Sequence, residues 1–318
     1  MNWNDIVHVI GFPLKIRMVE TLLFRRLNLK LFLLLIPALL FFFVFVIFPV
    51  FKALHTSFFE DDGINPPSWV GLSNWETVLR SRDIYHSLWL TVEVMILCWV
   101  VQTPLSLLLG LFLSKERRST NILSVFYFTP LLFSAAVVGI AWGYILNPNF
   151  GLLAAILTKV FGVSTVPDLL GNPRVVIFTL VAVISWQFIP FHTLLYQSGA
   201  RSIPAALYEA AELDGVNAWT RLWHITIPQM KNTIITSSVL ILTGSLTYFD
   251  LIFVLTNGGP GDASNVIALE MYKTAFQQYQ FGLGSVVAII MTIFGLLLSL
   301  VLVKVTGFSR MESQMEGV

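Results

Sequence analysis

The sequence predicts an all-α, polytopic membrane protein with six transmembrane helices. Of its 318 residues, 56% are hydrophobic and only 12% are charged, whereas a soluble domain has about a quarter charged residues. The mean hydropathy is +0.79, and six apolar runs are long enough to cross a bilayer. The net charge of +1 gives no nucleic-acid footprint, and the single cysteine, Cys98, excludes a disulfide framework.

The first apolar run, Leu31 to Phe51, follows a basic segment, residues 1–30. It is longer than the roughly 7–15-residue apolar core of a secretory signal and has no small-residue cleavage site. We therefore predict residues 1–30 as a cytoplasmic segment and residues 31–318 as the membrane domain. The first transmembrane helix then stays attached to the mature chain.

Five further apolar runs each match the roughly 20 residues that a helix needs to cross the hydrocarbon core. They are Leu88–Leu113, Leu123–Leu146, Val175–Tyr196, Ile234–Leu255 and Leu283–Val303. Backbone groups in lipid must be satisfied internally, and no run alternates as a barrel strand does, so we predict helices. Prolines in or near these runs predict kinks, at Pro37, Pro104, Pro130 and Pro190.

Lysine and arginine placement predicts the orientation. With the N-terminus inside, thirteen of the nineteen basic residues lie on inner segments. Both termini are then cytoplasmic, and residues 55–86, 147–173 and 256–282 face outward. In these outer segments we expect a turn at Asp61-Asp62-Gly63 and a short helix from Gly151 to Phe161. After a Gly-Gly-Pro-Gly turn we expect a short amphipathic helix.

Residues 201–228 form a mixed polar and apolar stretch between two membrane runs, on the predicted cytoplasmic side. Ser202 suits a helix N-cap, and Pro204 suits the first turn, where a missing N–H costs little. Gly215 suits the helix end because glycine takes positive φ freely. Asn217 then suits the cap of a second helix, so the stretch predicts a helix–glycine–helix elbow.

The second helix of the elbow is expected to end at Pro228. It carries an apolar, largely aromatic set: Trp219, Leu222, Trp223 and Ile225. We expect this aromatic side to pack and the acidic side of the elbow to face a partner. An alternative from the pattern alone is an amphipathic elbow that rests in the membrane interface.

Within the elbow, Glu209-Ala210-Ala211 is followed by three residues, Gly215, nine residues and Ile225-Thr226-Ile227-Pro228. This spacing resembles the EAA loop of ABC-importer permeases. The resemblance implies that the loop docks into a groove on a cytoplasmic ATPase. It assigns this coupling role to Glu209, Ala210, Ala211, Asp214 and Gly215.

Motifs for covalent chemistry are absent from the sequence. It has no G-x-x-x-x-G-K-[ST] phosphate loop and no H-E-x-x-H, G-x-S-x-G or C-x-x-C. We therefore expect no enzyme activity, no metal site and no cofactor in this chain. Three ionisable residues do lie in apolar runs, where such groups are costly and are functional candidates: Glu93, His192 and Asp250.

Two apolar runs carry polar and aromatic stripes. Ser185, Phe188 and His192 share one helix face, and Ile241, Ser245 and Tyr248 share another. Hydroxyl, amide and aromatic groups suit a sugar, whose hydroxyls need hydrogen-bond partners and whose ring faces stack on aromatics. Ordinary helix packing through small and hydroxyl residues is the alternative.

Three later motifs resemble the sugar-permease branch of ABC importers, the family of maltose and multiple-sugar transporter permeases. They are Leu255-Thr256-Asn257-Gly258-Gly259-Pro260, Ala275-Phe276 and Phe281-Gly282. The resemblance implies the type I importer permease fold and a sugar substrate, with a di- or oligosaccharide favoured. It implies substrate contacts at Ser185, Gln187, Phe188, Phe191, Ile241, Ser245 and Tyr248.

The implied machine lies in a bacterial-type plasma membrane. It contains a second, different permease chain, an extracellular binding protein and two cytoplasmic ATPase subunits that bind ATP and Mg. Two alternatives stay open at this point. The same scaffold could import glycerol phosphate esters or another polar solute, or the chain could be an ion-coupled secondary transporter, which usually shows more intramembrane carboxylates and paired repeats.

Overall fold

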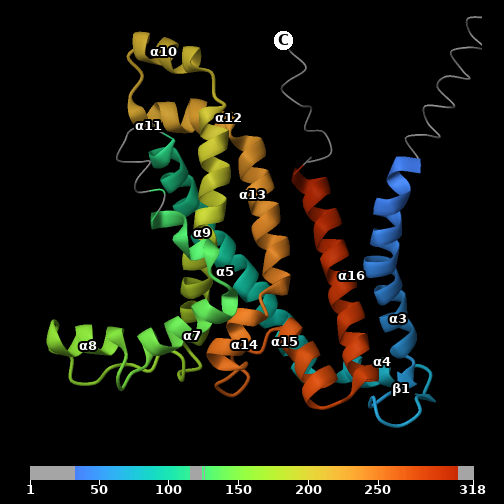
Figure 1. Cartoon of the computed structure of the whole chain (residues 1–318). Helices are drawn as coiled ribbons and strands as arrows, with labels where there is room; N and C mark the ends of the chain where they lie inside the picture. The colour runs from blue at the N-terminus through green and yellow to red at the C-terminus, as the bar shows by residue number, and fades with distance from the viewer. Residues whose placement is uncertain (1–32, 115–123, 125, 307–318) are drawn as a thin grey trace, which may run out of the picture. The chain divides into compact units, whose positions relative to one another are not determined.

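A computed structural model describes residues 33–114, 124 and 126–306. The chain divides into two compact units, residues 1–55 and residues 56–318, and each is described by itself (Figure 1). The predicted cytoplasmic segment, residues 1–30, lies outside the described residues. So do four basic residues that entered the orientation argument: Lys115, Arg117, Arg118 and Arg310.

In the first unit, one helix runs from Leu33 to Thr56. It includes the π turn η1 (Phe43–Ile47) and α3 (Phe48–Thr56). None of its most apolar window is buried, as expected for a helix that is apolar all round and faces lipid. The predicted first span, Leu31–Phe51, is confirmed from Leu33 onward, and the helix continues beyond its predicted end.

The second unit is helical apart from one hairpin, in the part of the chain that the structure describes. In the hairpin β1 (Phe59–Glu60) pairs antiparallel with β2 (Ser68–Trp69). The helical elements are, in order, α4 (Ser73–Arg80), α5 (Arg82–Leu113), η2 (Thr129–Leu132), α7 (Ala135–Leu146), α8 (Leu152–Lys159), α9 (Val176–Arg201), α10 (Ala205–Leu213), α11 (Ala218–Arg221), η3 (Leu222–Thr226), α12 (Ile227–Gln229), α13 (Lys231–Gly244), η4 (Ser245–Thr247), α14 (Asp250–Thr256), α15 (Ile267–Tyr272), η5 (Lys273–Gln277) and α16 (Phe281–Thr306).

Three of these helices, α5, α9 and α16, are continuous and apolar enough to cross a membrane. They confirm the predicted second, fourth and sixth spans, and each is longer than predicted. Pro104 and Pro190 lie inside α5 and α9 without ending them.

The predicted third and fifth spans are broken rather than continuous. The helix axis bends by 113° between Phe126–Leu132 and Ala135–Leu146. It bends by 49° between Lys231–Thr247 and Asp250–Thr256. The described residues therefore contain four continuous candidate spans, or six if each bent pair counts as one span. In the third span, Pro130 lies in the 3-10 turn η2, and the Ser134 hydroxyl accepts a hydrogen bond from Val137 N at 3.3 Å, which starts α7 afresh.

The break in the fifth span follows a run of hydroxyl residues. Ser245 Oγ donates to Ile241 O at 2.7 Å, and Thr247 Oγ1 donates to Gly244 O at 2.9 Å. Such bonds back to the preceding turn compete with the helical hydrogen bonds and bend helices. Gly244, Ser245 and Thr247 are all visible in the sequence, but the pattern predicted no break here.

The short helices expected in residues 147–173 and 256–282 are confirmed. Helix α8 falls within the predicted Gly151–Phe161, and α15 follows the glycine- and proline-rich turn. At the predicted hairpin turn, the Asp62 carboxylate accepts hydrogen bonds from Asn65 N at 2.8 Å and Ile64 N at 2.9 Å. These bonds favour the charged form and hold the pKa of Asp62 below its ordinary value.

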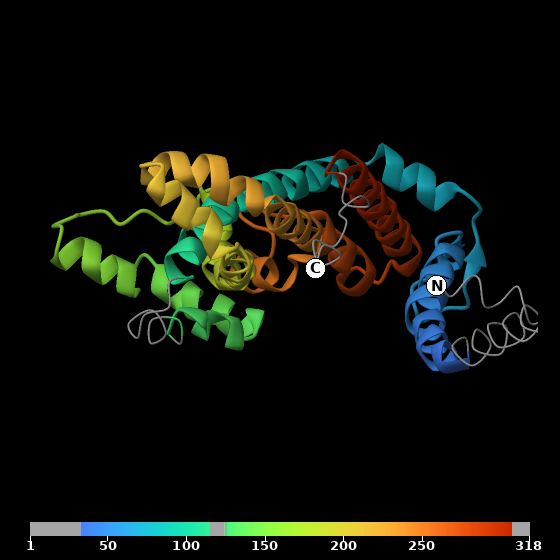
Figure 2. The ribbon, with the colours of Figure 1, turned by 90° about the horizontal axis from the view of Figure 1, so that it is seen from above.

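Helices α5 and α9 form the centre of the second unit. Figure 2 shows α9 nearly end-on, with α5 passing it obliquely. They can approach closely because Gly110 has no side chain. A Cβ added there would lie only 2.6 Å from the Tyr196 Cβ. Figure 1 places α10 and α11 at one end of α9 and α13, and α8, α14 and α15 at the other. Residues 201–228 therefore lie at one end of α9 and α13 (Figure 1).

Candidate coupling elbow and substrate cavity

The elbow has the helix–glycine–helix form that the sequence predicts. Gly215 has φ +70°, in the left-handed region that glycine adopts freely. Its N–H donates to Glu212 O at 3.1 Å, and Val216 N donates to Ala211 O at 2.9 Å, which closes the end of α10. Asn217 caps α11 by accepting a hydrogen bond from Thr220 N at 2.8 Å.

Two predicted boundaries of the elbow are wrong. Ser202 does not cap α10, because its hydroxyl donates to Gly199 O at 2.8 Å and Pro204 occupies the N-cap position. Pro228 does not end the second helix. It lies in the first turn of α12 after the π turn η3, where its missing N–H costs little, and the chain turns two residues later at Met230.

The predicted coupling residues lie mostly on the surface. Glu209, Ala210, Asp214 and Gly215 are exposed, and Ala211 is buried. On the side predicted to pack, Leu222 and Ile225 are half-buried, whereas Trp219 and Trp223 are exposed in this chain, with ring centroids 5.7 Å apart. Leu213, between the acidic residues, is 90% exposed. Acidic and large apolar side chains together on one surface are typical of a protein-binding site.

Several contacts fix the elbow to the C-terminal ends of α5 and α9. The Tyr208 hydroxyl lies 3.1 Å from Thr226 Oγ1, which ties α10 to η3. Tyr208 also packs beside a buried cluster of Tyr196, Ile203 and Met230. Arg201 Nε donates to Ser114 O at 3.3 Å. A displacement of the elbow would therefore be transmitted to both spans.

A cavity of about 440 Å³ lies at the break in the fifth span. It is lined by Leu131, Ala135, Phe188, Phe191, His192, Leu240, Gly244, Thr247, Tyr248, Asp250 and Leu251. Three of the seven predicted substrate contacts are brought together here: Phe188, Phe191 and Tyr248. The Phe188 and Tyr248 rings stack, with centroids 5.2 Å apart and an interplanar angle of 27°.

The other four predicted contacts are buried and lie outside the lining in this conformation: Ser185, Gln187, Ile241 and Ser245. Gln187 Nε2 donates to Phe133 O at 3.1 Å and so satisfies a carbonyl at the break of the third span. Ser185 Oγ and Gln187 Oε1 have no hydrogen-bond partner within the described residues.

The lining includes residues that the predicted contact set lacks. His192 Nδ1 lies 3.0 Å from Ser237 Oγ, which orients the imidazole. Asp250 opens α14 at the break, is exposed, and makes no hydrogen bond or ion pair in the described part of the chain. Both are ionisable groups in apolar runs, and that signal could have placed them in the set.

The cavity and elbow offer binding rather than covalent chemistry. Within residues 33–114 and 126–306, no group of three or more His, Cys, Asp or Glu side chains is arranged to hold a metal ion. The residues lining the cavity include no lysine or arginine. The wall instead combines stacked aromatic rings with a hydroxyl, an imidazole and a carboxylate, which are groups that bind polyhydroxylated solutes.

Comparison with known proteins gives a family. Residues 102–307 match the family described as binding-protein-dependent transport system inner membrane component. The trehalose/maltose transport system permease protein MalF of Thermococcus litoralis is 33% identical over 283 residues, which cover 88% of this chain and 94% of that protein. The arabinooligosaccharides transport system permease protein AraP of Bacillus subtilis is 30% identical over 280 residues, or 87% and 88% of the two chains.

A solved structure has the same fold. It is the crystal structure of a bacterial ABC transporter involved in the import of the acidic polysaccharide alginate. One of its chains aligns with a TM-score of 0.78 at 20% identity, over 93% of this chain and all of that one. The predicted importer permease fold is thus confirmed. The chain therefore belongs to the family of binding-protein-dependent transport system inner membrane components, the permeases of ABC transporters.

Proposed function

We propose that this chain is the permease subunit of an ATP-driven importer for a sugar, with a di- or oligosaccharide favoured. One observation carries the proposal. The cavity with the stacked Phe188 and Tyr248 rings lies beside the middle of α9, and the end of α9 leads directly into the exposed elbow. The trehalose/maltose and arabinooligosaccharide permeases among its relatives support a sugar as the solute.

In this proposal the chain does no covalent chemistry and binds no cofactor. Two cytoplasmic ATPase subunits bind ATP and Mg, and one of them receives Glu209, Ala210, Ala211, Asp214 and Gly215 in a surface groove. A second, different permease chain completes the path, and an extracellular binding protein delivers the sugar. Sugar binding alone cannot pump, so the ATP cycle must stabilise two conformations of the spans to different extents.

The sugar would bind against the stacked rings. The apolar faces of a pyranose pack on aromatic rings, and its hydroxyls bond to Thr247, His192 and Asp250. Ser185, Gln187, Ile241 and Ser245 remain proposed contacts. They would reach the sugar only in a conformation in which the bend between η4 and α14 or the bend before α7 changes.

The proposed location is a bacterial-type plasma membrane, with both termini cytoplasmic. The distribution of lysine and arginine supports this orientation. So does the position of the elbow at the opposite end of α9 from α8 and α14. The elbow then faces the compartment that contains ATP.

The cavity disfavours the alternative substrate class. A glycerol phosphate ester carries a dianion that calls for cationic groups, but the lining includes Asp250 and no lysine or arginine. An ion-coupled mechanism does not explain the exposed elbow. Such a transporter usually has more intramembrane carboxylates, whereas Asp250 is the single carboxylate among the residues that line the cavity.

The test is ligand-stimulated ATP hydrolysis by the purified complex in lipid, with the cognate binding protein and a panel of mono-, di- and oligosaccharides. We expect one sugar class to raise hydrolysis above the rate with empty binding protein. Uptake should survive collapse of the proton and sodium gradients. Failure of any ATPase to co-purify, or loss of uptake on collapse of the gradients, would contradict the proposal.

A further inference from the structure

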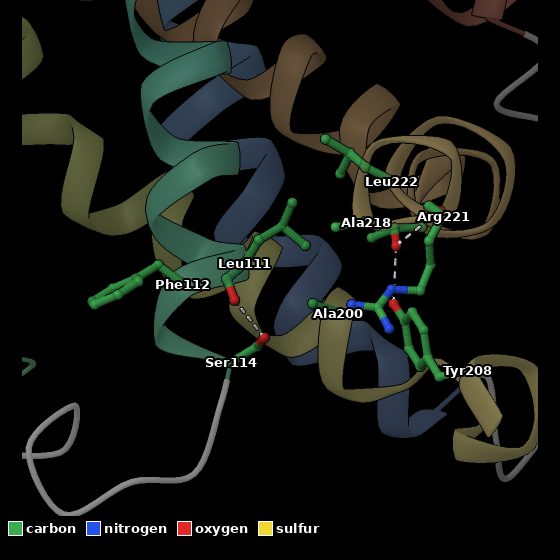
Figure 3. Close-up of a pocket in the computed structure, with 9 residues that line it drawn as sticks. Leu111, Phe112, Ser114, Ala200, Tyr208, Ala218, Arg221 and Leu222 are labelled. Carbon is green, nitrogen blue, oxygen red and sulfur yellow. Dashed lines mark hydrogen bonds between the residues drawn. The ribbon is translucent and has the colours of Figure 1, made fainter. Parts of the chain in front are cut away.

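A second cavity of about 440 Å³ lies where the elbow meets the ends of α5 and α9. Figure 3 shows Leu111 and Phe112 of α5 on one side and Tyr208 and Arg221 of the elbow on the other. Its walls are mostly apolar, and Arg221 is the one charged side chain among the described residues that line it. We call it the inner cavity. It shares no lining residue with the substrate cavity.

The inner cavity lies at the end of the apolar part of both spans. Ser114, which lines it, directly follows the last residue of α5, and Ala200 precedes Arg201, the last residue of α9. Phe112, two residues before Ser114, is 57% exposed. The cavity therefore lies where hydrocarbon gives way to the lipid head groups, with apolar walls and a cation at this boundary.

No described side chain neutralises the charge of Arg221. Its guanidinium carbon lies 5.6 Å from the centroid of the Tyr208 ring, and no carboxylate pairs with it in the described part of the chain. A contact through the face of the guanidinium leaves its edge N–H groups free to donate. Tyr208 is itself held by Thr226, which fixes the guanidinium beside the cavity.

A second arginine stands close to the same site. Arg201 Nε donates to the carbonyl of Ser114, a residue of the cavity wall. Arg201 is exposed, and its remaining N–H groups are not used in hydrogen bonds within the described residues. Two guanidinium groups thus lie near an apolar hollow at the cytoplasmic ends of two spans, an arrangement that suits an anionic lipid head group.

We propose that the inner cavity binds an anionic phospholipid of the inner leaflet. Arg221 donates to its phosphate, and the upper part of an acyl chain packs against Leu111 and Phe112. Because the walls come from α5 and α9 on one side and α10 and α11 on the other, a bound lipid joins the elbow to the spans. The lipid then strengthens the coupling of ATP hydrolysis to transport. The placement in the inner leaflet rests on the orientation given under the proposed function.

The experiment compares the assembled transporter in nanodiscs of phosphatidylethanolamine with and without phosphatidylglycerol. Native mass spectrometry measures the phosphatidylglycerol that stays bound, and ATP hydrolysis is measured in parallel. The variants are Arg221→Gln, the conservative Arg221→Lys, and Arg174→Gln as the matched control, since Arg174 is an exposed arginine outside this cavity. A further arm adds inorganic phosphate to discs without phosphatidylglycerol.

We expect the wild-type complex to retain phosphatidylglycerol and to hydrolyse ATP faster when it is present. Arg221→Gln should lower retention about fivefold, as expected for one arginine near an anionic surface, and should remove the lipid dependence. Arg221→Lys should keep part of both effects, and Arg174→Gln should behave like wild type. Inorganic phosphate alone should not raise hydrolysis, because it lacks the apolar part.

Three outcomes overturn the inference. Unchanged retention in Arg221→Gln excludes this site as the lipid site. An equal loss of hydrolysis in both kinds of disc means that Arg221 acts on the ATPase instead. Stimulation by inorganic phosphate alone means that the ligand is a free anion. Lipid retention needs no sugar, so a failure of the proposed transport function would leave this measurement interpretable.

Discussion

Two of the helix breaks in this protein, at the elbow and in the fifth span, have different physical causes. At the elbow, the chain reverses at Gly215, which is exposed, has φ +70°, and would have no atom within 4 Å of an added Cβ. In the fifth span, the chain bends at Tyr248, with φ −72° and ψ 70°, and Phe249 N donates to Thr247 O at 2.7 Å. The first break is set by the backbone freedom of Gly215, and the second follows hydroxyl side chains, Ser245 and Thr247, that bond back to the preceding turn.

The difference shows where each region binds. Irregular backbone at membrane depth is tolerated where it is buried in protein or lines a cavity, and the bend at Tyr248 does line the substrate cavity. The elbow is exposed and needs no such support, so its side chains remain available to a partner. This difference supports the proposal that one break marks a solute site and the other a protein-binding surface.

Gly215→Pro is expected to have the largest effect. Proline requires φ near −65° and has no N–H, so it fits neither the φ of +70° nor the hydrogen bond to Glu212 O. Sugar uptake should fall by about 100-fold or more, given a cost of about 3 kcal/mol at the elbow. Uptake by proteoliposomes is the measurement, with membrane insertion confirmed on the same preparation.

Two variants separate the elbow from a general proline effect. Gly162 has φ +66° and open space around its Cβ position, but it lies outside the elbow, so Gly162→Pro should leave uptake largely intact. Gly215→Asn should also retain most uptake, because asparagine tolerates the left-handed region. Equal losses in Gly162→Pro and Gly215→Pro would remove the special role of the elbow.

Glu209→Lys tests whether the elbow binds through its charge. Glu209 is exposed, so reversing it should leave the fold intact while placing a cation where the ATPase groove expects an anion. Like-charge contacts across an interface cost several kcal/mol, so ATP-driven uptake should fall to background. Co-purification of the ATPase is the second readout. Asp83→Lys reverses another exposed carboxylate outside the elbow, and it should retain both uptake and co-purification of the ATPase. Wild-type uptake in Glu209→Lys would contradict the coupling role of Glu209.

The exposed break could be predicted from sequence because its cause is local. Gly215 ends its helix through its own positive φ, and Asn217 caps the next helix through its own side-chain oxygen. The sequence predicts both roles correctly. Ser202 and Pro228 were misplaced because a tertiary environment decided between two local options: the Ser202 hydroxyl bonds backward to Gly199 O, and a π turn carries the helix through Pro228.

The embedded breaks and the cavity could not be predicted in the same way. Helix periodicity placed Ser185 on the face of Phe188, yet Ser185 is buried outside the lining. The bend of 113° in the third span supplies Leu131 and Ala135 to the cavity, and Gln187 supports that bend from α9. Ser185 and Phe188 both lie on the unbroken α9. Periodicity gives the face of a residue but not where along that face a cavity opens, and the bends in the neighbouring spans decide that position.

Phe188→Ala tests whether the aromatic wall of the substrate cavity contributes to sugar binding. The stacked pair of Phe188 and Tyr248 forms an aromatic wall, and such a contact is worth about 0.5–1.5 kcal/mol beyond its buried area. We expect sugar-stimulated hydrolysis to require about tenfold more loaded binding protein, with little change in the hydrolysis rate without sugar. Phe41→Ala removes one ring of a stacked pair in the first span, at 5.8 Å, and should leave both quantities unchanged. A matching loss in Phe41→Ala would indicate a structural effect.

Asp250→Asn is expected to give the smallest change in the uptake rate, together with a change in the preference between neutral and anionic sugars. The carboxylate lies at the start of α14 beside the cavity and has no partner in the described residues, so it is available to accept hydrogen bonds from sugar hydroxyls. Bonds to a charged acceptor are roughly twice as strong as neutral ones. Asparagine keeps the shape and a weaker acceptor, so uptake of the neutral sugar should fall only about fivefold.

The charge of Asp250 should matter more for discrimination than for rate. A carboxylate in the cavity repels an anionic solute, so Asp250→Asn should lower the preference for a neutral disaccharide over its aldonic acid. Binding of both sugars to the vanadate-trapped complex measures this preference without the selectivity of the binding protein. Asp83→Asn, a matched change at an exposed carboxylate outside the cavity, should preserve it. If the preference is the same in wild type and Asp250→Asn, the substrate lies elsewhere in the membrane, and the bend at Tyr248 loses its connection to the solute.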